Sequence, residues 1–208
     1  MHLTCLAIAA WVLAAAPVAP PPANGGKAAD TRARLATFLA EHDVPTAAEL
    51  RTLAQAPAPP LMTIATDEHA TALVRARAVA ALRLFPSPAV QGFLSKLVRS
   101  NAKSTDETMR LLLRRAAVTL GWLGGPRADA DLALLFENAD AEVRVDAAIG
   151  VGLTRAAEAP LFLRQQLAVE SVPRVRDEIE RALRAFPPPP PPPVKSIPMR
   201  EEPPIRGF

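Results

Sequence analysis

The sequence has few of the residues that build disulfide scaffolds, aromatic cores or metal sites. Its 208 residues include one cysteine, three histidines, no tyrosine and only 4% aromatic residues. A single thiol excludes a disulfide-stabilised fold, and the composition excludes a collagen-like chain and a polytopic membrane protein. Half of the residues are nevertheless apolar. We therefore expect a sizeable core made of aliphatic side chains.

The chain also lacks a strong excess of charge of either sign. It carries 24 Lys and Arg against 21 Asp and Glu, a net charge of +3. The pI of about 9.6 is high because 20 of the cations are arginine and almost nothing titrates between pH 7 and 10. Such a mixed surface lacks the concentrated positive face that a phosphate backbone rewards, so the sequence does not favour nucleic-acid binding.

Proline is abundant, and its distribution divides the chain. Seven of the 23 prolines run unbroken through residues 187–193, and four lie in residues 17–22. We expect a signal peptide with a proline-rich linker in residues 1–26, one folded domain in residues 27–186, and a disordered polyproline tail in residues 187–208.

The N-terminal segment is typical of an export signal. Residues 3–16, LTCLAIAAWVLAAA, form an uncharged apolar run of 14, which is short for a membrane span of about 20 residues. We predict that the protein is exported to the periplasm or the extracellular space. No Lys or Arg precedes the run and prolines follow the small residues, so an uncleaved anchor facing the periplasm is the main alternative. Lipidation at Cys5 is a further one.

The middle of the chain has a helical apolar period throughout and no useful strand pattern. Start and stop signals divide it: Thr46 and Glu49 form a capping box, Ser87 and Asp140 are N-cap residues, and Gly124 begins a helix stop. We predict an all-α fold. The ten expected helices span residues 30–42, 46–56, 60–66, 69–85, 88–100, 105–123, 128–138, 141–155, 159–169 and 173–186.

Four of these helices are versions of one another. Their aligned segments read VRARAVAALRLF (74–85), LLRRAAVTLGWL (112–123), VRVDAAIGVGLT (143–154) and VRDEIERALRAF (175–186). Each begins with a large aliphatic residue at what we number offset zero, and apolar residues recur at offsets four and eight on the same helical face. The copies are 38, 31 and 32 residues apart, which fits one helix pair for each repeat.

These residues resemble the HEAT-repeat family, in its short form of about 30 residues. The signature is fullest in residues 112–124 and 143–152, and the resemblance covers roughly residues 60–186. It implies a right-handed α-solenoid of about four to five helix pairs, with the second helices lining a concave face. It does not choose between a scaffold and an enzyme.

Side chains that could perform chemistry are sparse. Outside the expected signal, the histidines are His42, near a helix end, and His69, beside two carboxylates, and neither has a second ligand at metal-binding spacing. Nucleophile, phosphate-loop and dinucleotide motifs are missing from the sequence. We expect no enzymatic activity, no catalytic residues, no cofactor and no metal.

One surface feature points to a binding site. At offsets six and ten of the second and third copies stand four apolar residues, and arginines occur around them. If these offsets face outward, the residues form an apolar strip rimmed by cations, with the composition of an interface hot spot. The alternative is that these side chains pack against the adjacent repeat. The strip and its flanks are Val118, Trp122, Ile149, Leu153, Arg83, Arg114, Arg115, Arg181 and Arg184.

The functional prediction is a non-catalytic scaffold or adaptor that binds another protein or an extended peptide on its concave face. Two alternatives stay open. One is a membrane-tethered structural subunit that keeps residues 3–16 as its anchor, so that contact with a membrane requires an uncleaved or lipidated N-terminus. The other is a HEAT-type lyase-like enzyme, for which no catalytic residue can be named. The tail fits a semi-rigid spacer or a ligand for an aromatic groove.

Overall fold

A computed structural model describes residues 24–125 and 127–187. Within these residues the protein is all-α, with ten α-helices, one short 3-10 helix and no strand, which confirms the predicted class. The helices are α1 (Asn24–Glu41), α2 (Ala47–Leu53), α3 (Ala58–Thr66), α4 (Ala72–Ala81), η1 (Leu82–Leu84), α5 (Pro88–Asn101), α6 (Glu107–Leu123), α7 (Ala128–Leu135), α8 (Ala141–Thr154), α9 (Ala159–Val169) and α10 (Pro173–Arg184).

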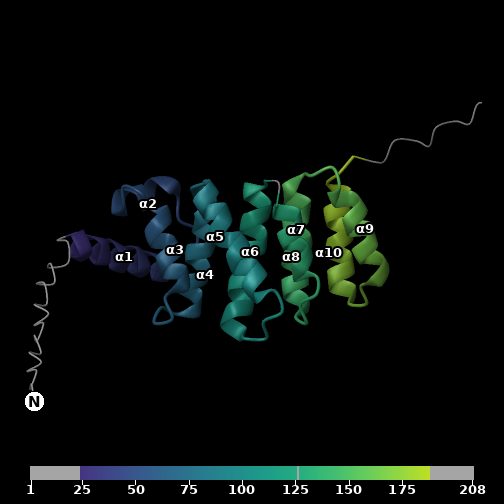
Figure 1. Ribbon diagram of the computed structural model, residues 1–208, viewed down its shortest axis with the longest axis horizontal. Coiled ribbons are helices and arrows are strands. Elements are labelled where there is room, and N and C mark those ends of the chain that lie inside the picture. Colours follow the sequence, from purple (N-terminus) through teal and green to yellow (C-terminus); the bar gives the residue numbers. More distant parts are fainter. Residues whose placement is uncertain (1–23, 126, 188–208) are drawn as a thin grey trace, which may run out of the picture.

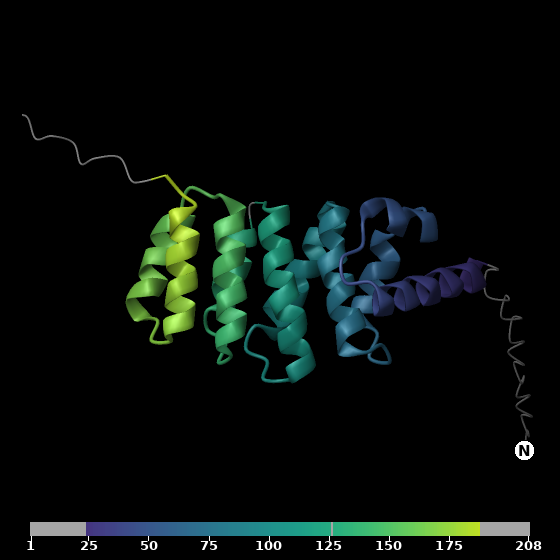
Figure 2. The same ribbon diagram turned by 180° about the vertical axis from the view of Figure 1, so that it is seen from behind.

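Successive helices pack in pairs, and the pairs lie next to one another. Helices α3 and α4, α5 and α6, α7 and α8, and α9 and α10 contact each other within pairs. Between pairs, α4 contacts α6, α6 contacts α8, and α8 contacts α10. Figure 2 shows these four helices, which are labelled in Figure 1, side by side in one row. Helix α1 lies across the end of the row that α4 forms. The four aligned sequence segments therefore form a single layer.

The predicted N-cap residues occupy their expected positions. The Thr46 side chain accepts from the Glu49 amide while the Glu49 carboxylate accepts from Thr46, which completes the capping box of α2. The hydroxyl of Ser87 caps α5, and the carboxylate of Asp140 caps α8. Gly124, at φ 61°, ends α6 in a conformation that side chains disfavour. Local hydrogen bonds thus set these boundaries.

Helix α1 begins earlier than predicted. It starts at Asn24 rather than at residue 30, so Gly25 and Gly26 lie inside a helix and the expectation that they form a linker is wrong. No proline follows until Pro45, and glycine costs a helix only about 1 kcal/mol per residue. From Gly26 to Asp30 every residue is exposed, so these turns are held by backbone hydrogen bonds rather than by packing.

Three predicted helices are shorter than expected, and the first of them, α2, ends at Leu53 rather than at residue 56. Helix α4 begins after Thr71, whose hydroxyl accepts from the Val74 amide at 3.3 Å, and it tightens into η1 before Pro86. Helix α7 ends at Leu135 rather than at residue 138. The side chain of Asn138 is instead buried and donates to the carbonyl oxygen that ends α5, at 2.5 Å.

The arginine at offset one has a single role in three of the four copies. Arg75, Arg144 and Arg176 each donate to backbone carbonyls in the last turn of the preceding helix or in the segment just after it, at 2.7 to 3.1 Å. In the second copy Leu113 takes this position and is buried, and Asn138 from the next helix pair serves the unpaired carbonyl. Side chains thus satisfy helix C-termini across the layers.

The core lies between the row of α4, α6, α8 and α10 and the helices paired with them, and it consists mainly of Leu, Val and Ala. The residues at offsets zero and four are buried in all four copies, and at offset eight only Leu183 is partly exposed. Helices α6 and α8 approach closely because glycine faces backbone: a Cβ on Gly150 would lie 2.6 Å from the carbonyl oxygen of Ala117. The absence of a side chain on Gly150 therefore allows α6 and α8 to pack closely.

Some predictions concern residues that the structure does not describe. The predicted signal in residues 3–16 and the polyproline tail from residue 188 onward lie outside the described ranges. Within those ranges, no helix has both the length and the apolar character that crossing a bilayer demands.

Candidate binding groove

The apolar residues of the predicted strip differ in exposure. Trp122, at the C-terminal end of α6, is 61% exposed, whereas Val118 one turn earlier is half-buried. On α8, Leu153 is half-buried, and Ile149 packs against the core. Both interpretations of the strip therefore hold in part. Trp122 is thus exposed at the end of its helix, whereas Ile149 lies in the middle of α8 and contacts the core.

Trp122 lies beside a groove between α4 and α6. A cavity of about 360 Å³ is lined by Arg83, Leu84 and Trp122. Arg83 and Leu84 also line a second cavity of about 410 Å³, so the two cavities adjoin the same residues. We call the two cavities together the α4–α6 groove. The other residues of the second cavity are Asp43, Val44, Pro45, Leu73, Ala76, Arg77, Ala80, Ala81, Leu111 and Arg115.

The wall of the groove is apolar and its rim is basic. Arg77 is committed to structure, since it bonds the carbonyl oxygens of Leu39 and Ala40 and pairs with Asp43. Arg83 and Arg115 are exposed, and neither forms a salt bridge with another described residue. Their two charges are thus available to an acidic ligand.

Arg114 does not belong to this rim. Its guanidinium Nε donates to Asp146 at 2.6 Å, and its Nη2 lies 3.4 Å from Glu142, so it links α6 to α8. Burial raises the pKa of the Asp146 carboxyl above its usual value, and Arg114 and Arg115 oppose that rise. We therefore assign Arg114 to holding the helix row together, which corrects its prediction as a free flanking cation.

The two arginines predicted on α10 lie outside the groove. Arg181 and Arg184 are exposed, and Arg181 pairs with Glu178 one turn away at 2.5 Å. Neither lines the cavities between α4 and α6, and nor do Ile149 and Leu153. Of the nine predicted site residues, the groove lining brings together Trp122, Arg83 and Arg115.

The sequence prediction missed two exposed apolar residues of the groove. Leu73 is 49% exposed and Val44 is 73% exposed, and both line the second cavity. Leu73 stands at offset minus one, seven positions before offset six, so extending the outward stripe by two turns finds it. Val44 belongs to the loop between α1 and α2, and its place beside α4 depends on tertiary packing that no local pattern encodes.

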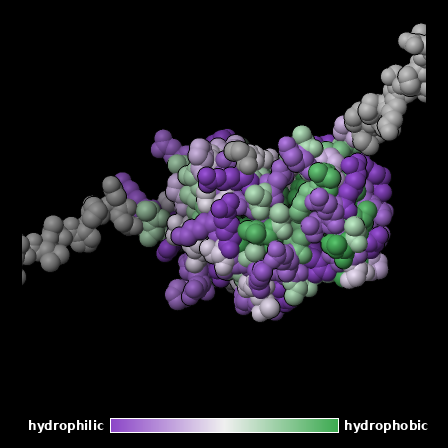
Figure 3. Space-filling view, turned by 45° about the vertical axis from the view of Figure 1, so that its right-hand side comes forward, coloured by the Kyte–Doolittle hydropathy of each residue, from purple (hydrophilic) through white to green (hydrophobic). Residues whose placement is uncertain are grey.

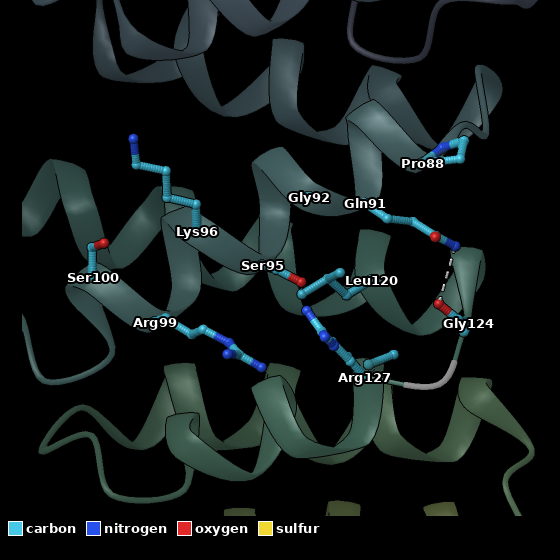
Figure 4. A pocket seen from close by; sticks show the side chains of 12 residues that line it. Pro88, Gln91, Gly92, Ser95, Lys96, Arg99, Ser100, Leu120, Gly124 and Arg127 are labelled. Atoms are coloured by element: carbon cyan, nitrogen blue, oxygen red, sulfur yellow. Dashed lines mark hydrogen bonds between the residues drawn. The ribbon is translucent and has the colours of Figure 1, made fainter.

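A polar cavity of about 500 Å³ lies on another part of the surface, between α5, α6 and α7. In Figure 4, Arg99 and Arg127 point into the space near Ser95, and Lys96 points away. The fully buried Asp131 accepts from Ser95 and, at 2.5 Å, from Arg99. Ser95 and Arg99 of α5 thus both donate to the same α7 carboxylate, which links the two helices.

The two histidines that the structure describes, His42 and His69, have different surroundings. The His42 ring stacks on Phe38 with centroids 4.1 Å apart, and its Nδ1 lies 3.0 Å from the Phe38 carbonyl oxygen at the end of α1. His69 is exposed in the turn before α4. In the part of the chain that the structure describes, no three His, Cys, Asp or Glu side chains are grouped so that they could hold a metal ion.

The remaining exposed large apolar side chains are spread over other helices. They are Leu134 on α7, and Leu161 and Val169 on α9. Figure 3, with the C-terminal end turned forward, shows small apolar patches separated by polar residues. None of these three residues lines a cavity with Trp122. Of the exposed large apolar residues, Val44, Leu73 and Trp122 are those that line the cavities of the α4–α6 groove.

No protein-family model matches this sequence, and no curated protein matches it.

Proposed function

We propose that the chain is a non-catalytic scaffold that binds an extended segment of another protein in the α4–α6 groove. The fold that we propose for it is a right-handed, HEAT-like α-solenoid whose second helices carry the binding face. Support for the fold comes from the pairwise contacts of successive helices and from the single row formed by α4, α6, α8 and α10. The groove lies between two helices of that row, α4 and α6.

The exposure of Trp122 is the observation that carries the functional proposal. A tryptophan that leaves 61% of its surface in water, beside a cavity with an apolar wall, has the properties of an interface anchor. Arg83 and Arg115 add two free charges at the rim. The chemistry therefore favours a peptide that combines apolar side chains with acidic ones.

A peptide-binding experiment tests this function. Peptides that mix acidic and apolar residues would be selected against the full chain, and their affinities measured by fluorescence anisotropy. Because hot-spot truncations cost about 2 kcal/mol or more, Trp122→Ala is expected to weaken binding roughly 30-fold. Arg83→Gln with Arg115→Gln should weaken binding and flatten its salt dependence.

Leu161→Ala is the matched control, because Leu161 is 60% exposed but lies on α9, outside the groove. It should leave the affinity unchanged. Equal affinities for the wild type and a folded Trp122→Ala variant would contradict the proposal.

We also propose that the protein is exported, on the basis of the apolar run in residues 3–16. Mass spectrometry of the mature N-terminus tests this. A chain that begins after residue 16 supports cleavage and export, and an intact N-terminus in the membrane fraction supports the tethered alternative.

A further inference from the structure

We propose that the C-terminal tail of this chain, residues 188–208, occupies the α4–α6 groove of the same molecule and competes with external ligands. The inference rests on the proposed function, because it uses the same groove and identifies an internal ligand for it. It is carried by the point where the tail leaves the fold, the length of the tail, and the match between its residues and those of the groove.

The tail begins at the same end of the helix row at which Trp122 lies. Ala185, just after α10, stands at offset ten, and so does Trp122 on α6. Equal offsets lie at similar heights along the row, since Gly152 at offset nine of α8 faces Ala182 at offset seven of α10. Leu153, half-buried at offset ten of α8, lies on the way between them. The row of offset-ten residues thus leads from the start of the tail to Trp122.

The polyproline run has the length that this path requires. Helices in contact are about 8–10 Å apart, so the two steps from α10 over α8 to α6 cover roughly 20 Å. The six prolines of residues 188–193 favour polyproline II and span about 19 Å at roughly 3.1 Å per residue. A polyproline II run of this length is therefore long enough to reach from the end of the described chain almost to Trp122.

The chemistry of the tail matches that of the groove. Proline-rich segments in polyproline II conformation dock on exposed aromatic rings, which Trp122 offers. Glu201 and Glu202 follow the prolines, in a tail that also carries Lys195, Arg200 and Arg206, so the charge match is confined to the acidic pair. Starting from Pro187, 14 extended residues span about 43 Å, which exceeds the roughly 20 Å to Trp122 plus about 10 Å back along α6 to Arg115. The acidic pair can therefore reach the unpaired arginines.

Proximity quenching in the full chain tests the inference. In a Trp11→Phe, Cys5→Ser background, Trp122 is the only tryptophan, and a nitroxide is attached at Val194→Cys, the residue that follows the polyproline run. We expect the label to quench Trp122 strongly, because a nitroxide quenches only a fluorophore in near contact. Combining Glu201→Gln and Glu202→Gln should reduce the quenching several-fold. As a control, the same label on Ala168→Cys, an exposed site on α9, should not quench.

A mixing experiment separates the same molecule from a second copy. Labelled chains carrying Trp122→Phe are mixed with unlabelled chains that retain Trp122. Quenching within one chain but not in the mixture supports the inference, and quenching in the mixture assigns the groove to a second copy and overturns it.

Titration with the selected peptide then separates this inference from the proposed function. If the tail occupies the groove, the peptide relieves quenching and binds the Glu201→Gln, Glu202→Gln variant about tenfold more tightly than the wild type. Peptide binding without any tail quenching overturns the tail inference and leaves the proposed function standing. Quenching that no peptide relieves supports the tail contact and contradicts the general binding function.

Discussion

At the scale of single residues, charged side chains stabilise this protein mainly by bonding across helices. Arg144 donates to both carboxylate oxygens of Glu170, at 2.8 and 3.1 Å, and to two carbonyls at the end of α7. Asp131 is completely buried beneath α5. Such groups matter more to stability than exposed pairs, since losing one partner leaves a buried polar group without its bond.

The Arg144–Glu170 pair gives the folded state a pH dependence. Hydrogen bonds from Arg144 and from the amides of Val172 and Ser171 lower the pKa of Glu170 below its ordinary value. The unfolded chain therefore binds a proton at a higher pH than the folded one. The stabilisation is complete above about pH 4.5 and is lost as the pH falls through the lower, folded pKa.

We predict that Glu170→Gln reduces the free energy of unfolding by about 1–2 kcal/mol at pH 7, with a smaller difference below pH 4. Urea unfolding at several pH values measures this. A difference that stays constant with pH would contradict the assigned role.

A second prediction at this scale concerns the buried carboxylate. Replacing Asp131 by Asn leaves an amide facing Arg99 and should cost about 2–3 kcal/mol of stability. Asp30→Asn is the control, because Asp30 pairs with Arg34 across 3.4 Å at a largely exposed site, and its loss should cost less than about 0.5 kcal/mol. Similar unfolding midpoints for the two variants would contradict the distinction.

At the scale of helices, the sequence predicted the elements where the signal is local. The caps at Thr46, Ser87 and Asp140 depend on residues within three positions, so their boundaries were accessible. The end of α7 was not, because Asn138 is buried against a carbonyl 36 residues earlier in the chain. The start of α1 was misplaced because two glycines suggested a break that the surrounding residues do not enforce.

The closest helix contact gives a prediction for α8. Gly150→Ala would force a Cβ against the α6 backbone at Ala117 and against Leu132, and should destabilise the fold by about 1–3 kcal/mol. Gly92→Ala is the matched control, since Gly92 lies in α5 with open space around its Cα. That substitution should stabilise by up to about 1 kcal/mol. Thermal unfolding compares the two variants, and equal shifts would rule out a packing role for Gly150.

At the scale of the whole molecule, the repeated segments predicted which helices share a layer, but the sequence left open whether Trp122 is exposed or packed against the adjacent repeat. The other half of the groove could not be predicted in this way. Val44 and Arg77 meet because α1 lies across the end of the row, where Arg77 bonds the last carbonyls of that helix. The commitment of Arg114 to Asp146 likewise depends on the spacing of α6 and α8.

Chemical-shift mapping of the full chain with a selected acidic, apolar peptide tests the central claim most directly. The account predicts that the indole NH of Trp122 and the amides of α4, η1 and α6 around the groove shift on binding. The Trp122→Ala variant should lose those shifts while keeping the spectrum of the folded protein. Shifts confined to α5, α7 and α9, with Trp122 unaffected, would contradict the assignment of the binding site to the α4–α6 groove.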